Sequence, residues 1–164
     1  MRDFPTERLD PRIKSVWRIN DAITVALVAL VCIVPFAIVC AAAPEEAPWA
    51  LVVVAAEAVA AIVALGLVLA VLPPIRYARW RYELSPAFLD IACGILWRKR
   101  YVIPFIRVQN TDTRQGPVLR AFGLSSVTVA TAAGEHEIPG LGNEEADLLR
   151  DRAAELARLA REDV

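Results

Sequence analysis

The sequence predicts a two-helix transmembrane hairpin followed by a small α+β domain. Residues 22–43 contain no charge, and residues 49–72 contain Glu57 as their only charge. A bilayer core about 30 Å thick is crossed by roughly 20 apolar residues in a helix, so each run is long enough to span it. After residue 80 the apolar residues alternate along the chain, which is typical of strands, and the C-terminal segment returns to helical spacing.

The residues that flank the two apolar runs predict their orientation. Residues 44–48 form a short acidic connection with a proline at each end, whereas Lys and Arg precede the first run and follow the second. Basic residues close to membrane spans stay in the cytoplasm. We therefore expect a multi-pass protein of the cell membrane with both termini and the α+β domain in the cytoplasm. Trp17, Trp49 and Trp80 are expected at the membrane interfaces, where an apolar ring carries a polar N–H.

These patterns divide the chain into four parts. We expect a cytoplasmic N-terminal arm at residues 1–20, the hairpin at 21–73 with helices at about 22–43 and 49–72, a juxtamembrane linker at 74–80, and the α+β domain at 81–164. The arm shows no sustained period, so it is expected to be irregular and to lie near the headgroups. Pro73 and Pro74 are expected to stop the second helix, because proline lacks the backbone donor that a helix needs.

The α+β domain is predicted to be a small antiparallel β-barrel or sandwich capped by a C-terminal α-helix. A single helical turn is expected at residues 118–122, stopped by Gly123. Asn143 is expected to cap the C-terminal helix, whose apolar stripe packs on the strands. Strands are expected at residues 81–85, 88–93, 96–103, 106–114, 126–132 and 135–138.

Composition gives little support for catalysis. Three cysteines without a paired C-x-x-C spacing and a single histidine, His136, supply neither a disulfide framework nor a zinc site. No glycine-rich phosphate loop, G-x-S-x-G elbow or H-E-x-x-H motif occurs in the sequence. We therefore expect a protein that is not an enzyme and that uses no cofactor or metal.

One stretch carries a family resemblance. Residues 103–124 read IPFIRVQNTDTRQGPVLRAFGL, which resembles the signature of bacterial PH domains of the YdbS kind, formerly called membrane-flanked domains. The resemblance covers about residues 80–159. It implies a PH-like barrel that follows two transmembrane helices, in a membrane-anchored module whose ligand is generally unestablished. The motif positions are Pro104, Arg107, Gln109, Gln115, Gly116, Pro117, Arg120 and Gly123.

The residues themselves suggest mainly structural uses for this motif. Gly116 and Pro117 favour a turn, and Gln109 and Gln115 are suited to satisfying backbone groups in a chain corner. Arg107 and Arg120 have two open interpretations, either anion binding or ion pairs with Asp112 or with a carboxylate of the C-terminal helix.

Basic residues close to the membrane form the first candidate site. On one interpretation they contact anionic lipid headgroups, each contributing on the order of 1 kcal/mol. On the other they reflect the topology of the hairpin and a solvated edge strand. The residues are Arg76, Arg79, Arg81, Arg98, Lys99 and Arg100.

Glu57 is the second candidate site. An ionisable residue within a membrane span is costly and therefore indicates a functional contact, such as one with a partner membrane protein. The alternatives are that Glu57 reaches outward to the interface, or stays protonated against an oxygen of the first helix.

Two functions from different classes follow. The first is a membrane-anchored, non-catalytic scaffold whose domain binds a protein partner or anionic headgroups at the cytoplasmic face. The second is an accessory subunit of a membrane transporter or membrane enzyme complex, contacting it through the hairpin. The expected partners are membrane lipids and a protein partner or a second copy of the chain. Nucleic acid is not expected, because the basic residues are few and close to the membrane.

Overall fold

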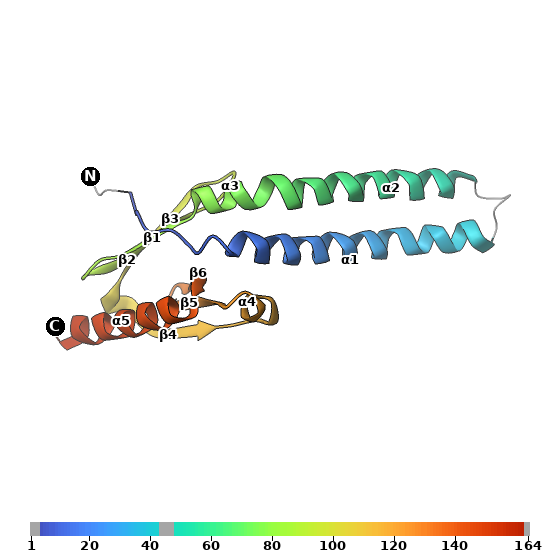
Figure 1. Ribbon diagram of the computed structural model, residues 1–164. Helices are drawn as coiled ribbons and strands as arrows, with labels where there is room; N and C mark the ends of the chain where they lie inside the picture. Colours follow the sequence, from blue (N-terminus) through green and yellow to red (C-terminus); the bar gives the residue numbers. More distant parts are fainter. Residues whose placement is uncertain (1–3, 43–47, 163–164) are drawn as a thin grey trace. The chain divides into compact units, whose positions relative to one another are not determined.

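The computed structural model describes residues 4–42 and 48–162. The chain forms two compact units. The hairpin unit is Trp17–Pro73, and the strand unit combines Met1–Val16 with Pro74–Val164. The segment before the first long helix therefore belongs with the strands (Figure 1). The expected acidic turn lies largely outside the described residues, which resume at Pro48.

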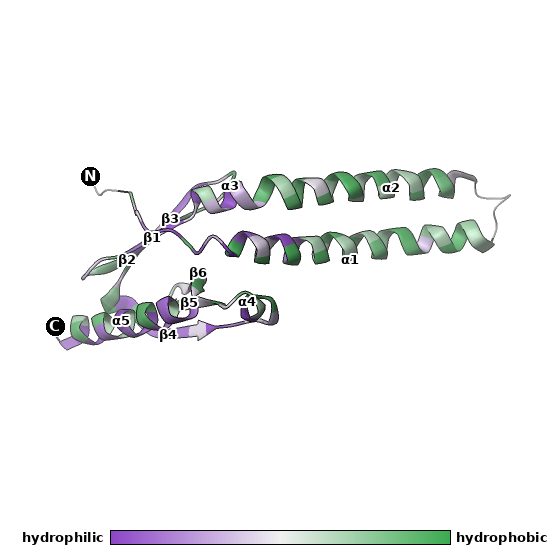
Figure 2. Ribbon diagram, in the orientation of Figure 1, coloured by the Kyte–Doolittle hydropathy of each residue, from purple (hydrophilic) through white to green (hydrophobic). Residues whose placement is uncertain are grey.

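Two long helices form the hairpin unit and run side by side (Figure 1). They are α1 (Ile13–Ala42) and α2 (Pro48–Gly66), and the rings of Phe36 and Trp49 meet edge to face at 6.3 Å. Two helical stretches, Ile13–Ala42 and Trp49–Arg79, are long and apolar enough to cross a membrane. Figure 2 shows the apolar colouring along both helices. Their apolar side chains point outward, as contact with lipid tails requires.

The second helix does not stop at its proline pair, so that expectation is wrong. A π-helical turn, η1 (Leu67–Val71), follows α2 and leads into α3 (Leu72–Arg79), which contains both prolines. Neither Pro73 nor Pro74 has an N–H to give to the Leu69 carbonyl, the acceptor four or five residues earlier. Arg18 of α1 donates its Nε–H to that oxygen at 2.9 Å. The carbonyl that the prolines leave open therefore has a side-chain donor, and the helix continues to Arg79.

The strand unit contains two three-stranded antiparallel sheets. The first has the order β1-β2-β3 and the second the order β4-β5-β6. A short 3-10 turn, η2 (Phe105–Arg107), joins them, and α4 (Pro117–Ala121) connects β4 to β5. The strands are β1 (Arg81–Leu84), β2 (Phe88–Cys93), β3 (Lys99–Pro104), β4 (Val108–Arg114), β5 (Leu124–Thr131) and β6 (Gly134–Gly142).

The predicted fold class is confirmed, in the form of two sheets and a C-terminal helix. Among the described strands no ladder joins one sheet to the other, so the barrel is not closed. Helix α5 (Asn143–Glu162) packs on β4, β5 and β6, with its small residues Ala146, Ala153 and Ala157 buried. Burial of each large apolar side chain stabilises the fold by roughly 1.5–3 kcal/mol. The core residues facing the helix and sheets include Phe105, Leu124, Val127, Val129, Ile138 and Leu141.

The N-terminal arm is largely irregular from residue 4 to residue 12, as expected, and it also contacts the strands of its unit. Glu7 forms an antiparallel bridge with Tyr82 of β1, and their backbones exchange two hydrogen bonds of 3.1 Å. Leu9, Ile13 and Val16 are 2%, 1% and 2% exposed. The arm therefore supplies core residues to the strand unit, although the hairpin separates it from the strands in sequence.

Candidate functional site

Five of the six predicted basic residues line one pocket of the strand unit. This pocket, called the basic pocket below, has a volume of about 380 Å³. It lies where the end of α3, the start of β1 and the β2–β3 connection meet. Arg76 of α3 is not among its lining residues. The lining consists of Phe4, Ala78, Arg79, Arg81, Ala92, Cys93, Arg98, Lys99 and Arg100.

Strand pairing explains why these residues meet. Ala92 is paired with Arg81 on one side and with Arg100 on the other, and Cys93 is paired with Lys99. A basic residue at the start of β1 and two at the start of β3 therefore lie beside the end of β2. Residues from distant parts of the sequence converge because β2 is the central strand of its sheet.

Arg100 has a structural partner. Its guanidinium forms a forked pair with Asp90, with Nε 3.0 Å from both carboxylate oxygens and Nη2 2.5 Å from Oδ2. The Asp90 side chain is only 4% exposed, so Arg100 neutralises a buried carboxylate. The hydrogen bond with Asp90 raises the pKa of Arg100. The guanidinium carbon also lies 6.0 Å from the centre of the Phe4 ring. The main role of Arg100 is therefore structural, because it pairs with a buried carboxylate.

The other basic residues keep more of their donors for a ligand. Arg79 donates one N–H to the Ile95 carbonyl, and Arg81 donates to the Trp80 carbonyl at 2.6 Å. A guanidinium has five N–H donors, so each retains several. Arg98 and Lys99 are exposed, at the end of the β2–β3 connection and at the start of β3. The pocket can therefore present cations from both sides to an anion.

Cys93 adds no reactive thiol to this pocket. Burial raises the pKa of its thiol, and the positive charge of Lys99 opposes that shift. A thiol with a raised pKa is a poor nucleophile near neutral pH. Among the described residues no group of three or more His, Cys, Asp or Glu side chains is placed to hold a metal.

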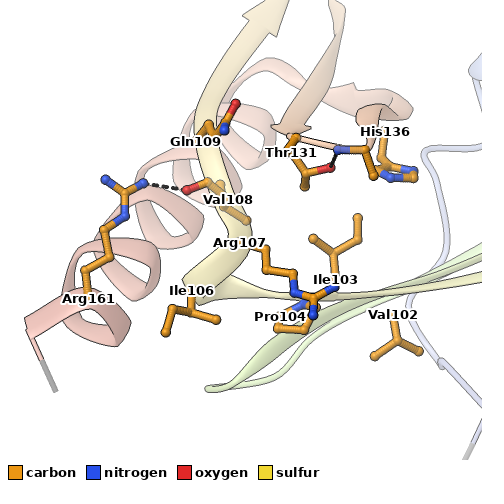
Figure 3. A pocket seen from close by; sticks show the side chains of 12 residues that line it. Val102, Ile103, Pro104, Ile106, Arg107, Val108, Gln109, Thr131, His136 and Arg161 are labelled. Atoms are coloured by element: carbon orange, nitrogen blue, oxygen red, sulfur yellow. Dashed lines mark hydrogen bonds between the residues drawn. The ribbon is translucent and has the colours of Figure 1, made fainter. Parts of the chain in front are cut away.

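Three residues of the family motif line a second pocket of about 640 Å³ (Figure 3). Pro104, Arg107 and Gln109 line it, and Figure 3 shows the Arg107 side chain extending beside Pro104. Arg161 of α5 closes one side by donating to the Val108 carbonyl at 2.5 Å. His136, on the opposite side, is half-buried against Tyr101, with ring centres 4.7 Å apart. His136 is therefore not an exposed hairpin residue.

The remaining motif positions lie around α4. Gln115 donates to the Leu124 carbonyl and to Asn143 Oδ1, both at 3.0 Å. Asn143, expected as a helix cap, also accepts a hydrogen bond from Ser125 Oγ at 2.9 Å. These contacts connect the end of β4, the start of β5 and the start of α5. Gly116 precedes α4, Pro117 begins it, Arg120 lies within it and Gly123 follows it.

In the described part of the chain, Arg107 forms no ion pair with Asp112. Asp112 Oδ2 accepts a hydrogen bond from Asn110 Nδ2 at 2.7 Å. Arg107 and Arg120 are both exposed, but they are separated by β4 and occupy different turns. The two motif arginines therefore do not form one anion site with each other.

Glu57 lies in a cavity of about 270 Å³ between α1 and α2 of the hairpin unit. Small side chains dominate its walls, which allows another helix to approach closely. The Thr24 hydroxyl in this cavity donates to the Asn20 carbonyl at 2.9 Å. The lining residues are Thr24, Val25, Val28, Ala29, Glu57, Ala60, Ala61 and Ala64.

Two features of the site were missed by sequence reasoning. Trp80, expected at the membrane interface, is 8% exposed and belongs to the core of the strand unit. Trp97, to which we assigned no interfacial role, is 81% exposed at the β2–β3 connection. The signal that could have identified Trp97 as an exposed residue was its position between Leu96 and the basic residues 98–100.

Comparison with known proteins establishes the family. A family model described as bacterial PH domain matches residues 12–157, which include the hairpin unit and most of the strand unit. The chain belongs to the bacterial PH-domain family. It is also 36% identical over 166 residues to the UPF0699 transmembrane protein YdbS of Bacillus subtilis (strain 168), covering 100% of both chains. No solved structure gives a significant match. These matches confirm the family resemblance and, with the two apolar helices, identify a membrane-associated protein of this family.

Proposed function

We propose that this protein is a multi-pass membrane anchor whose strand unit binds anionic lipid headgroups at the cytoplasmic face. The supporting observation is the basic pocket, which brings five Lys or Arg side chains together at the end of α3. An anionic membrane surface attracts such residues with about 1 kcal/mol each. The positive flanks of the hairpin support the cytoplasmic orientation. The proposed role is non-catalytic.

The test must separate residues that bind a ligand from residues that hold the fold. Arg100 is unsuitable for neutralisation, because its loss would leave the Asp90 carboxylate buried without its partner. Arg98 and Lys99 are exposed, so the double variant Arg98→Gln/Lys99→Gln removes two charges from the pocket with little effect on packing. Arg120→Gln/Arg152→Gln removes the same charge from exposed positions outside the pocket and is the matched control.

Native mass spectrometry of the full-length protein provides the measurement. The protein is released from mixed micelles containing phosphatidylglycerol and phosphatidylcholine, and the ratio of retained lipids is recorded. Two charges at about 1 kcal/mol each correspond to roughly a tenfold or greater loss of preference for the anionic lipid. The control variant should keep the wild-type ratio. Equal ratios for the wild type and both double variants would reject the headgroup site.

A second candidate function rests on the hairpin. The cavity around Glu57 supports an accessory subunit that contacts a transporter, a membrane enzyme complex or a second copy of the chain through α1 and α2. Glu57→Gln should then shift the oligomeric mass measured by light scattering in mild detergent, or remove a stoichiometric protein that co-purifies with the wild type. If both the mass and the co-purifying proteins are unchanged, this candidate fails while the headgroup proposal stands.

A further inference from the structure

The connection between β2 and β3 exposes two large apolar residues side by side. Leu96 is 90% exposed and Trp97 is 81% exposed, the highest values for large apolar side chains in the described part of the strand unit. Neighbouring apolar side chains exposed to this degree lose the free energy of burial that the rest of the core gains. Such a pair indicates a surface that is covered by a partner.

The backbone of this connection keeps the pair away from the core. The ladder between the strands ends with Cys93 opposite Lys99. Gly94 then has φ +109°, and a Cβ at that position would lie 1.9 Å from the Trp97 carbonyl oxygen. The turn therefore depends on glycine, and its tight closure leaves Leu96 and Trp97 at the tip.

The tip is attached to the helix that continues from the second apolar run. Arg79, the last residue of α3, donates to the Ile95 carbonyl. Helix α3 begins at Leu72, and Arg79 follows Pro73, the last residue of the hairpin unit, by six residues. The tip is therefore bonded to a residue that lies close to the second apolar run in sequence.

The chemistry of the tip fits a membrane interface better than a protein surface. Tryptophan favours this layer because its ring is apolar and its N–H is polar. Arg98 and Lys99 follow the apolar pair directly and line the basic pocket, so cations lie next to the apolar tip. An anionic membrane offers both complements, with phosphates for the cations and the acyl boundary for the rings and methyl groups.

We propose that Leu96 and Trp97 insert into the interface of the membrane that holds the hairpin, so that the β2–β3 connection is a second membrane contact. This inference extends the proposed headgroup binding, because insertion of the tip would place the basic pocket at the level of the phosphates. The hairpin tethers the chain, and the tip then fixes how the strand unit meets the lipid surface.

Depth measurements on the full chain test insertion. A nitroxide is attached at Leu96→Cys in a chain whose Cys32, Cys40 and Cys93 are replaced by alanine, at one copy per nanodisc. Leu148→Cys is the matched control, because Leu148 is a 71% exposed leucine on α5 in a pocket lined by Glu7 and Glu145. We expect the label at position 96 to be several-fold less accessible to a water-soluble nickel complex than the control, and more accessible to oxygen. Equal accessibility of the two labels would overturn insertion.

Two lipid compositions distinguish insertion from the headgroup site. Insertion in nanodiscs of pure phosphatidylcholine, together with no lipid preference in mass spectrometry, would support the tip contact and reject the headgroup site. A water-exposed label together with preferential retention of phosphatidylglycerol would reject insertion of the tip and support the headgroup site.

A measurement on the chain with its cysteines intact guards against misfolding of the labelled variant. Lipids brominated near the headgroup quench nearby indole fluorescence, and the difference between wild type and Trp97→Phe isolates the Trp97 signal. Strong quenching of that signal is expected, and an unquenched Trp97 would overturn the proposal.

Discussion

Ile13 and Gly140 are packed so closely that a side chain at position 140 has no room. A Cβ built on Gly140 would lie 2.4 Å from Cγ1 and Cδ1 of Ile13. Ile13 begins α1, whereas Gly140 lies in a bulge of β6, where Pro139 and Gly140 are opposite Ser126 alone. The Gly140 carbonyl, freed by the bulge, accepts a hydrogen bond from the Asp10 N–H at 3.0 Å. Gly140 therefore joins the N-terminal segment of the strand unit to β6.

Gly140→Ala should destabilise the full-length protein. Its φ of +65° alone costs a residue with a side chain about 1–2 kcal/mol, and the overlap with Ile13 adds to that cost. Gly142→Ala is the matched control in the same strand, because nothing lies within 4 Å of a Cβ there. Thermal unfolding in detergent should show a lower Tm for the first variant and little change for the second. Equal Tm values for both would contradict this packing.

Leu9→Ala should also destabilise the strand unit, although Leu9 precedes the first long helix. Its side chain is 2% exposed, and truncation of a buried leucine costs roughly 2–5 kcal/mol. Leu148→Ala truncates a leucine that is 71% exposed and should change the free energy of unfolding little. Chemical denaturation followed by tryptophan fluorescence would compare the two variants. An arm that does not contribute to the core would give the same unfolding midpoint for both variants.

Local patterns predicted the elements of this fold well, because each element has a period or a breaker within its own sequence. Every expected strand is present, with shifts at its ends, and residues 118–122 overlap α4. The start of β3 moved from residue 96 to Lys99 because residues 94–98 form the turn that carries Trp97. Alternation of side chains continues through such a turn and so does not reveal it.

Contacts between distant segments could not be predicted in this way. The burial of Leu9, Ile13 and Val16 depends on strands that lie beyond the hairpin in sequence, so no local pattern records it. The same limit applied to the two tryptophans, because tertiary packing decides that Trp80 is buried and Trp97 exposed. The basic residues were predicted from composition alone, whereas their convergence in one pocket required the strand register.

Glu7→Gln should stabilise the protein at neutral pH more than at pH 4. Burial raises the pKa of Glu7 above 4.5, and the nearby Glu145 and Glu83 charges add to this shift, although a hydrogen bond with Tyr82 opposes it. When the pKa of a carboxyl is raised in the folded state, the protein loses stability as the pH rises through 4.5 towards that higher pKa. The glutamine variant lacks this loss, so its Tm advantage should grow between pH 4 and pH 7.

Glu155→Gln provides a control with the opposite sign. A hydrogen bond from Arg158 lowers the pKa of Glu155. Glu155 therefore stabilises the protein above pH 4.5, and this stabilisation is lost as the pH falls. This exposed pair should give only a small decrease in Tm at pH 7, which disappears in acid. If the two variants showed the same pH trend, the burial of Glu7 would not be the cause.

Arg100→Gln and Arg98→Gln should differ in stability despite removing the same charge from the same pocket. The first leaves the Asp90 carboxylate, 4% exposed, without the guanidinium that pairs with it. The second removes an exposed side chain of the β2–β3 connection. We expect a clear loss of Tm for Arg100→Gln and almost none for Arg98→Gln. Partial recovery in the double variant Arg100→Gln/Asp90→Asn would show that the unpaired carboxylate causes the loss.

The hydrogen bond from Arg18 to the Leu69 carbonyl should depend on the proline that follows. Pro73 lacks the N–H that an ordinary helix would give to this carbonyl, and Arg18 Nε supplies a donor at 2.9 Å. Arg18→Leu should therefore destabilise the hairpin by on the order of 1 kcal/mol, since a carbonyl in an apolar layer would lose its partner. Pro73→Ala restores a backbone N–H four residues after Leu69 and gives the carbonyl a second source of hydrogen bonding.

A double-mutant cycle measures this dependence. In the Pro73→Ala background, Arg18→Leu should cost clearly less in unfolding free energy than it does in the wild type, when both are measured in bicelles. Arg18→Lys separates charge from geometry, because an ammonium keeps the charge but lacks the planar guanidinium donor. Additive effects of Arg18→Leu and Pro73→Ala would mean that the arginine acts through its charge near the headgroups. A non-additive cycle would instead assign it to the carbonyl that the proline pair leaves open, and would explain why a helix with two adjacent prolines continues to Arg79.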